Sequence, residues 1–336
     1  MIQDQTSVEH IRNAMASGSM LLNRLRDDPF GIKGQEFTAL RLSSSGGCAA
    51  ALALKGSTRG IREVDEKGSR IFELGHQRGE SLLNALKLGM DSLSMSEEVP
   101  TITAELPVRM KIGDASDPMK LLALADAFPG MVSDVRHERE ADGSIKSATA
   151  SLYAKGHLDG FIQGAKFDRV VEIKTMNPFV IKKVEEDKIG TVNENYITQL
   201  ACYETALVEM GITTWERLLP GLFICEDKAN CALKLVELPH DQAKLYAGRA
   251  KARFARVVQY LAEFHTHNGL TDPGVADLRE YAPDGNGKLP WQCNYCDVAK
   301  LCWGSRLKST ESKAAKPQLY VIPEIPEDIL NEEGEA

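Results

Sequence analysis

The chain has 336 residues, of which 43% are hydrophobic and 26% charged, a composition typical of globular proteins and not of disordered or fibrous ones. No stretch of the sequence reaches the roughly 18 uninterrupted apolar residues of a membrane span. The opening MIQDQTSVEH also lacks the basic and then apolar layout of a secretory signal. We therefore expect a cytoplasmic protein with no membrane partner.

The net charge of −8 at first argues against a polyanionic ligand. Six of the acids lie in residues 317–336, however, which contain no lysine or arginine, and removing those six charges leaves −2 for the rest. A nearly neutral body can present a basic face to phosphates. The seven cysteines of a cytoplasmic chain are expected to be ligands, nucleophiles or core residues rather than disulfides.

The hydrophobic pattern changes period along the chain and so predicts both helices and strands. The expected order is a polar helix within the first forty residues, a short apolar helix after Cys48, a helix at 69–88, strands within 101–175, a helix at about 193–210, a hairpin at 220–238 and a long helix at about 241–267. This order predicts an α/β or α+β core built around a central mixed sheet.

Three charged residues interrupt an otherwise apolar pair of predicted strands, GHLDGFIQGAKFDRVVEIKTM, at 156–176. Because side chains alternate along a strand, Glu172 and Lys174 share one face. The link QGAKFD is short enough for a hairpin, so Asp159 can lie beside Glu172. Two adjacent carboxylates repel unless they are protonated or bridged by a cation. Since oxygen ligands suit Mg²⁺ and Mn²⁺, the pair predicts a divalent metal site.

Asp159, followed after a gap of twelve residues by Glu172-Ile173-Lys174, resembles the PD-(D/E)XK nuclease motif, and GHLDGF with VVEIKT is similar to its RecB-like branch. The resemblance implies an α/β, restriction-endonuclease-like core with a central mixed sheet flanked by helices. It also implies that Asp159, Glu172 and the Ile173 carbonyl bind the metal, and that Lys174 positions or activates the attacking water. The metal would stabilise charge developing on the phosphate. A surface hairpin with an ordinary Glu-Lys face is the alternative, because this spacing also arises by chance.

Two further helices match the RecB-like pattern. Downstream, YITQLACYETAL places Tyr196, Gln199 and Tyr203 on one helical face, where Gln199 is expected to bind the site or the DNA backbone and Tyr203 to stack or donate to a phosphate. Upstream, ELGHQRGESLL offers His76 and Glu80. The family pattern puts a histidine near position 79, where this chain has a glycine, so either residue could be the third metal ligand. Ordinary helix packing is the alternative for the tyrosines.

The segment WQCNYCDVAKLCW places Cys293, Cys296 and Cys302 in a C-x2-C-x5-C pattern, and Cys48 lies far upstream. Four such residues suit zinc or an iron–sulfur cluster, and the spacing alone does not choose. The layout resembles nucleases of the AddB type and the small nucleases of CRISPR adaptation, which implies a [4Fe-4S] cluster joining the N-terminal and C-terminal segments, with zinc less favoured. The other three cysteines are expected to be core or surface thiols: Cys202, Cys225 and Cys231.

The predicted long helix carries a basic stripe interleaved with aromatic residues, a pattern that suits a channel in which phosphates are neutralised and bases stack. A solvated amphipathic helix is the alternative. The residues expected to contact DNA are Lys182, Lys183, Tyr196, Arg249, Lys251, Arg253 and Arg256.

Together these features and the resemblance predict an Mg²⁺- or Mn²⁺-dependent deoxyribonuclease. The resemblance to nucleases with an iron–sulfur cluster implies an exonuclease on single-stranded DNA or DNA ends that acts in recombination, repair or phage DNA processing. The sequence has no GxxxxGK[ST] phosphate loop, so unwinding would need a helicase or recombination partner. The alternatives are a structure-specific endonuclease, a non-catalytic nucleic-acid-binding adaptor with a nuclease-like fold, and a zinc-stabilised structural protein. We expect an N-terminal helical segment at 1–40, a nuclease domain with its cluster at 41–312, and an acidic flexible tail at 313–336.

Overall fold

The structure is a computed structural model. It describes residues 40–57, 77–89, 100–142, 145–186, 188–266, 274–294, 296, 298–309 and 318–321. The chain divides into two compact units, one formed by Met1–Gly46 with Gly60–Ala255 and the other by Gly47–Arg59 with Arg256–Ala336. The predicted domain boundaries stay a prediction, and the N-terminal helical segment and almost all of the acidic tail lie outside the described residues.

A six-stranded mixed sheet forms the centre of the first unit. Its strands are β1 (Thr101–Ala115), β2 (Val132–Arg139), β3 (Ile145–Gln163), β4 (Asp168–Met176), β5 (Gly221–Asp227) and β6 (Leu233–Leu238). The order is β1-β3-β4-β5-β6, and β2 pairs with the first half of β3. Only β4 and β5 are parallel among these pairs. The sheet is flanked by helices, which confirms the predicted α/β class.

The helices of the first unit agree with most of the sequence predictions. They are η1 (Leu42–Ser44), a helix at 77–89, α4 (Pro118–Ala127), α5 (Pro178–Ile181), η2 (Ile189–Thr191), α6 (Glu194–Glu209) and the part of α7 (His240–Thr266) up to Ala255. Helix α4 was not predicted, because it interrupts a region of strands. Its signal is local: Pro118 occupies the first turn, and the Asp117 side chain caps the helix by accepting from Met119 N and Lys120 N.

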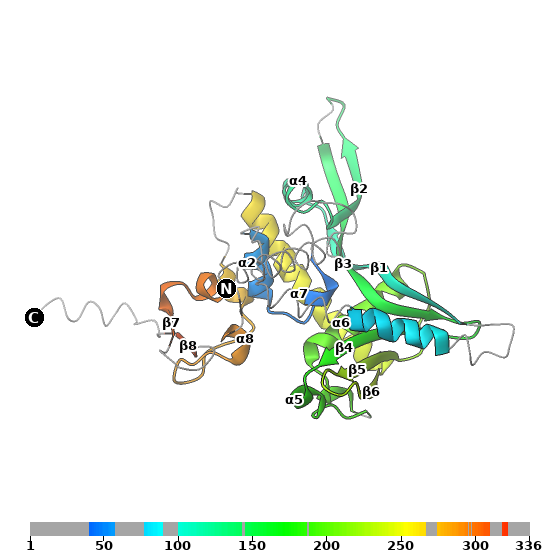
Figure 1. Cartoon of the computed structure of the whole chain (residues 1–336). Helices are drawn as coiled ribbons and strands as arrows, with labels where there is room; N and C mark the ends of the chain where they lie inside the picture. Colours follow the sequence, from blue (N-terminus) through cyan, green and yellow to red (C-terminus); the bar gives the residue numbers. More distant parts are fainter. Residues whose placement is uncertain are drawn as a thin grey trace, which may run out of the picture. The chain divides into compact units, whose positions relative to one another are not determined.

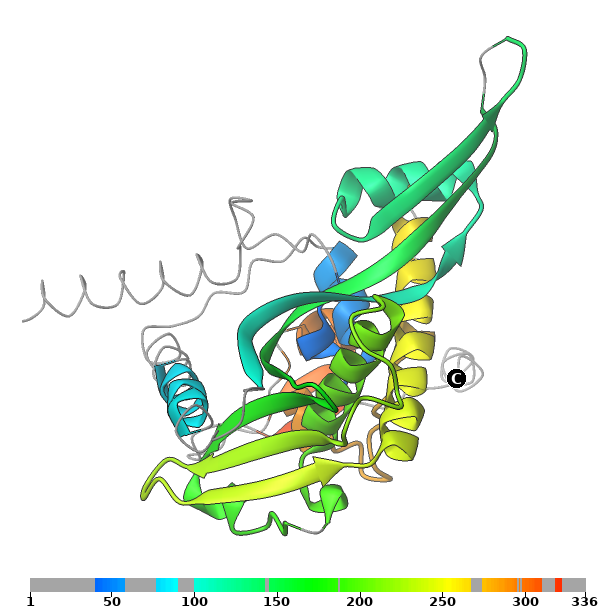
Figure 2. The same ribbon diagram turned by 90° about the vertical axis from the view of Figure 1, so that its right-hand side faces the viewer.

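The strand β2 and the first half of β3 form a long hairpin that extends past the other strands, with α4 beside it (Figures 1 and 2). The second half of β3 pairs with β1 on one side and β4 on the other. This second half, with β4, carries the predicted catalytic charges.

Both faces of β4 are covered by helices. On one face Leu83 of the helix at 77–89 packs with Val171, Ile173 and Ile224. Gly160 permits this approach, since an added Cβ there would meet Leu83 Cδ2 at 2.7 Å. Because Glu172 and Lys174 alternate with these residues, they point to the opposite face, where α6 contacts β4.

The second unit is small and rich in short elements. It contains α2 (Ala49–Ser57), the end of α7, η3 (Val275–Leu278), α8 (Trp291–Asn294), α9 (Ala299–Trp303), η4 (Gly304–Arg306), β7 (Leu307–Ser309) and β8 (Leu319–Val321). Its buried cluster comprises Leu289, Cys293, Trp303 and Val321. Among the residues that the structure describes in both units, no helix is long and apolar enough to cross a membrane.

Candidate active site

Asp159 lies where the pairing of β3 with β4 ends. The antiparallel register runs from Gln163 opposite Asp168 to Gly160 opposite Val171. One residue further, Asp159 Oδ2 accepts the Ile173 N–H at 2.7 Å, so a carboxylate continues the ladder in place of a carbonyl. This bond fixes the Asp159 carboxylate next to Glu172, as the hairpin interpretation of the sequence requires.

Glu172 is fully buried, and its two oxygens differ in their surroundings. The Oε1 atom accepts from the Lys174 ammonium, whereas Oε2 has no hydrogen-bond partner within the described residues. Burial, and secondarily the Asp159 charge, raises the pKa of Glu172 to about 8. A buried carboxyl oxygen without a partner costs free energy, so this atom is poised to receive a proton or a cation.

Lys174 is held by groups from two elements. Its ammonium donates to Glu172 Oε1 on β4 and to Gln199 Oε1 on α6 at 3.3 Å. Burial alone would lower the pKa of Lys174, but the charges of Glu172 and Asp159 outweigh burial and raise it. The lysine therefore remains an ammonium and acts as a fixed positive charge and donor.

The three α6 residues predicted to share a face all lie at this site. The Lys174 ammonium is 5.0 Å from the centre of the Tyr196 ring. Gln199 Nε2 donates to the Tyr203 hydroxyl at 3.0 Å, which orients the amide so that its oxygen faces Lys174. Burial, followed by the charges of Glu172 and Asp159, raises the pKa of Tyr203 well above its usual value. Tyr203 can approach β3 because Gly156 lacks a side chain, whose Cβ would lie 2.9 Å from its ring.

A further acid, Glu105, lies close to the site and was not predicted. In the β1–β3 register Ala104 is opposite Gly160 and Leu106 is opposite Leu158, which places Glu105 across from Asp159. Glu105 has a φ of 50°, a conformation that costs free energy for a residue other than glycine. Its charge is one of the causes that raise the pKa of Glu172. The sequence gives no signal for it, since only the strand register brings it near.

The identity of the third metal ligand, His76 or Glu80, stays a prediction. His76 lies outside them. Glu80 is exposed on the helix at 77–89, which packs Leu83 on the face of β4 opposite Glu172. Across the described parts of the chain, no three His, Cys, Asp or Glu side chains are grouped so that they could hold a metal ion.

The two carboxylates nevertheless fit a magnesium or manganese ion. Mg²⁺ is commonly bound by one or two carboxylates together with waters and substrate phosphates. The unpartnered Oε2 of Glu172 next to Asp159 matches this donor set, with the Ile173 carbonyl between Glu172 and Lys174 in the chain as a further oxygen. The fit rests on the unpartnered Oε2 of Glu172 and not on a complete set of metal ligands.

The four cysteines predicted to form a cluster site all belong to the second unit. Burial, followed by the charges of the nearby Cys296, Cys48 and Cys302, raises the pKa of Cys293 to about 11. Burial also raises the pKa values of Cys296 and Cys302. Four half-buried or buried thiols are a donor set for a thiolate-bound centre, although they are not grouped at ion-binding spacing in the described structure.

Local structure positions these cysteines. Cys48 precedes α2, and its carbonyl accepts the Leu52 N–H at 3.1 Å. The Cys296 N–H donates to the Cys293 carbonyl at 3.1 Å, and Arg279 holds the Cys302 carbonyl while stacking on Trp303 at 4.2 Å. Of the other cysteines, Cys202 and Cys225 are buried and Cys231 is exposed.

The predicted DNA-binding residues are distributed and only Tyr196 touches the site. Their placements are as follows: Lys182 and Lys183 are exposed after α5, Arg249 lies 5.6 Å from the Tyr246 ring, Lys251 pairs with Glu209, Arg253 donates to the Ser45 carbonyl, and Arg256 pairs with Glu280 at 3.1 Å in the second unit. Arg253 thus makes a contact within the first unit, whereas the exposed lysines and Arg249 have their charges at the surface. DNA contact by these residues stays a prediction.

Comparisons with known proteins add little. No family model matches the chain, and no curated protein matches it. Among solved structures, the crystal structure of a protein called SSO0001 is 14% identical, covers 87% of this chain and 96% of that chain, and has a TM-score of 0.38. A likeness of this degree assigns neither a family nor a function.

Proposed function

We propose that the chain is a metal-dependent deoxyribonuclease of the PD-(D/E)XK type, RecB-like branch, acting as an exonuclease on single-stranded DNA or DNA ends. The observation that carries the proposal is the group formed by the fully buried Glu172 with the half-buried Asp159 and Lys174. An ordinary surface hairpin would expose its Glu-Lys pair, but here Glu172 is fully buried and one of its oxygens has no partner in the described residues. Such a costly arrangement is typical of functional sites.

A Mg²⁺ or Mn²⁺ ion bound at Asp159 and Glu172 would polarise the phosphate and make water more acidic. The residues of the chain supply the rest. Asp159 is fixed by the Ile173 N–H, and Glu172 is oriented by Lys174, so neither carboxylate must reorganise to bind a cation. The Lys174 ammonium provides a fixed charge for the negative phosphate as charge develops in the transition state.

The helix α6 would hold Lys174 in place during hydrolysis. Tyr203 orients Gln199, Gln199 accepts from Lys174, and the Tyr196 ring lies over the same ammonium. The three residues therefore limit the positions that the ammonium can adopt, which is how positioning groups contribute to catalysis. We infer that Gln199 and Tyr203 act through Lys174.

We also propose that Cys48, Cys293, Cys296 and Cys302 hold a [4Fe-4S] cluster. Support comes from the mutual proximity of the four thiols and from their all-sulfur chemistry, which suits iron–sulfur clusters. The cluster would bind parts of the chain that are distant in sequence, namely the start of α2 and the α8–α9 segment.

The direct test is a time course of digestion of 5′- and 3′-labelled single- and double-stranded DNA, and of circular DNA, in Mg²⁺ and Mn²⁺. We expect mononucleotides from labelled ends, and we expect Asp159→Asn and Lys174→Met to lower the cleavage rate by about 100-fold or more. Lys166→Met, in the turn of the same hairpin, is the matched control and should retain activity. Full activity of either site variant would remove the assignment, and cuts in circular DNA would identify an endonuclease instead.

A further inference from the structure

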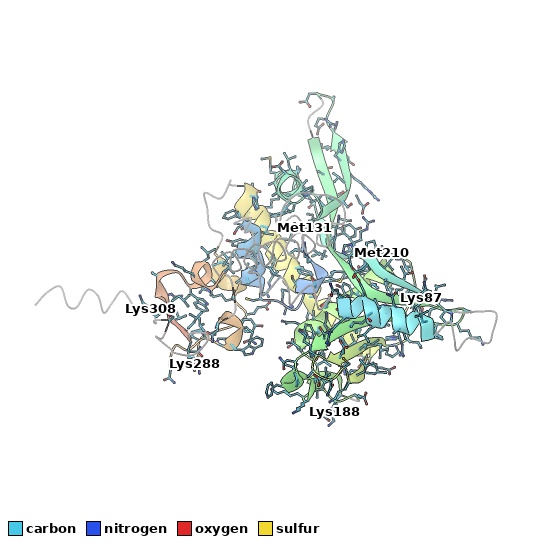
Figure 3. The ribbon with its side chains drawn as sticks, viewed as in Figure 1. Lys87, Met131, Lys188, Met210, Lys288 and Lys308 are labelled. Carbon is cyan, nitrogen blue, oxygen red and sulfur yellow. The ribbon has the colours of Figure 1, made fainter. Side chains whose placement is uncertain are left out.

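A cavity of about 560 Å³, lined in part by charged residues, lies in the first unit at the C-terminal end of α6. Its lining includes Arg109 and Lys111 of β1, Tyr153 of β3, Glu209 and Met210 at the end of α6, and Lys251 of α7. Figure 3 labels Met210 at this end of α6 beside β1, in agreement with the contact of the Arg109 N–H with Met210 Sδ at 3.3 Å. The volume is that of a small-ligand pocket.

The pocket already binds one anion, a carboxylate of the chain itself. Glu209 Oε1 accepts from the Lys251 ammonium, and Glu209 Oε2 accepts the Lys111 N–H at 2.9 Å. Glu209 is the last residue of α6, where the negative end of the helix disfavours an acid. Donors from β1 and α7 thus bind the Glu209 carboxylate, although the negative end of the α6 dipole does not favour an acid at this position.

A second cation of the pocket remains available. The Arg109 guanidinium stacks 4.6 Å from the centre of the Tyr153 ring, and no carboxylate is paired with it in the described part of the chain. Stacking orders the planar guanidinium and leaves its N–H edges free for a ligand. The Lys111 ammonium pairs with Asp114 at 2.8 Å on the surface, an interaction weak enough to yield to a stronger anion.

We propose that this pocket binds a phosphate group of the DNA strand on which the active site acts, an inference that rests on the proposed function. Arg109 and Lys251 would hold the phosphate, and Glu209 would act as a competing anion that the strand displaces. A tetrahedral phosphate accepts from a guanidinium edge and an ammonium together.

The position of the pocket is consistent with a strand leading to the active site. Along α6, Glu209 lies about 15 Å from Gln199 at 1.5 Å per residue. Along β3, Tyr153 lies about 20 Å from Asp159 at about 3.3 Å per residue. Both elements therefore connect the pocket with the site over about 15–20 Å, a distance that a strand of several nucleotides can span.

The test measures binding without cleavage, by fluorescence anisotropy of labelled dT12 and dT3 in EDTA. We expect Arg109→Ala and Lys251→Ala to weaken dT12 binding by about 10-fold and to reduce the slope of log affinity against log salt by about one for each charge removed. Glu209→Gln should tighten dT12 binding instead, because it removes the competing anion. The short dT3, which cannot span both sites, should bind weakly and be nearly insensitive to these variants.

Controls separate the pocket from general charge and from other ligands. Lys244→Ala removes an exposed lysine of α7 that lies over Trp215 and should leave affinity unchanged; an equal loss would indicate a diffuse basic helix and overturn the proposal. Competition by thymidine monophosphate or by poly-glutamate as effectively as by dT12 would assign the pocket to a free nucleotide or to an acidic peptide, and would also overturn it. If the pocket variants bind DNA normally while Lys174→Met abolishes cleavage, this inference falls and the nuclease proposal stands. If the pocket variants weaken binding while Lys174→Met cleaves normally, the phosphate pocket stands and the nuclease proposal falls.

Discussion

Two buried glutamates in the first unit have pKa values raised to about 8, both mainly by burial. Glu172 forms an ion pair with Lys174, but Glu204 of α6 has neither of its oxygens hydrogen-bonded in the described residues. Glu204 lies against the start of β5, where a Cβ on Gly221 would come within 2.8 Å of its Oε1. The nearby Gly221 N–H and Arg169 lower the pKa of Glu204 only in part.

The raised pKa of Glu204 predicts a pH-dependent stability. Above its ordinary pKa of 4.5 the unfolded chain releases the proton, whereas the folded chain keeps it until about 8. The contribution of Glu204 to stability is therefore fully present below pH 4.5 and falls by about 1.4 kcal/mol per pH unit until it is lost as the pH rises through 8. Glu204→Gln should unfold with a smaller pH slope than the wild type in urea titrations at pH 5 to 8. Exposed Glu194→Gln is the control, and identical slopes for wild type and Glu204→Gln would contradict the assignment.

At the residue scale, the sequence predicted which side chains meet at the site where their positions follow from the local periodicity of a strand or helix. The alternation of β4 and the i, i+3, i+7 spacing in α6 suffice to bring Lys174, Tyr196, Gln199 and Tyr203 onto facing surfaces. Glu105 and the Arg109 pocket could not be found in this way, because each depends on the register between strands or on the end of a helix meeting a strand.

At the element scale, Gly160 sets the distance between β3 and the helix at 77–89. Gly160→Ala would place a Cβ 2.7 Å from Leu83 Cδ2 and should lower the free energy of unfolding by about 1–3 kcal/mol. Gly113→Ala in β1, where an added Cβ meets nothing within 4 Å, is the matched control.

Urea titration of these variants gives the comparison. In the double variant Gly160→Ala with Leu83→Ala, the two effects should not add, because the smaller side chain removes the overlap. Equal stability of Gly160→Ala and wild type would show that the helix adjusts its position freely.

The elements themselves were predictable where their patterns are long. The helix predicted at about 193–210 is α6 (Glu194–Glu209), and the hairpin at 220–238 is β5 with β6. Helix α4 was missed because its ten residues follow a strand and precede another, so the surrounding period masked the Asp117-Pro118 start signal.

At the scale of the whole molecule, each compact unit is built from segments that are not consecutive in the sequence. Residues 47–59 group with the C-terminal part from 256 onward, and the four predicted cluster cysteines belong to that unit. The sequence predicted that Cys48 meets the distant cysteines only through a family resemblance, since no periodicity links residues so far apart. The division into units had no local signal at all.

The cluster proposal predicts the colour and iron content of the protein. Anaerobically purified wild type should be brown and contain about four iron atoms per chain. Cys302→Ser should lose iron and visible absorption, whereas Cys231→Ser, which removes an exposed thiol between β5 and β6 in the first unit, should keep both. Colourless protein with one zinc per chain would show a zinc site instead.

The central claim is that Asp159 and Glu172 form a divalent metal site, and Mn²⁺ binding measured by electron paramagnetic resonance tests it most directly. Wild type should bind Mn²⁺ in the presence of a non-cleavable DNA analogue, and Mg²⁺ should compete. Glu172→Gln and Asp159→Asn should each weaken this binding by at least about 10-fold, while Lys166→Met should bind as wild type does. Unchanged Mn²⁺ affinity in both carboxylate variants, or no Mn²⁺ binding by the folded wild type, would contradict the proposed site.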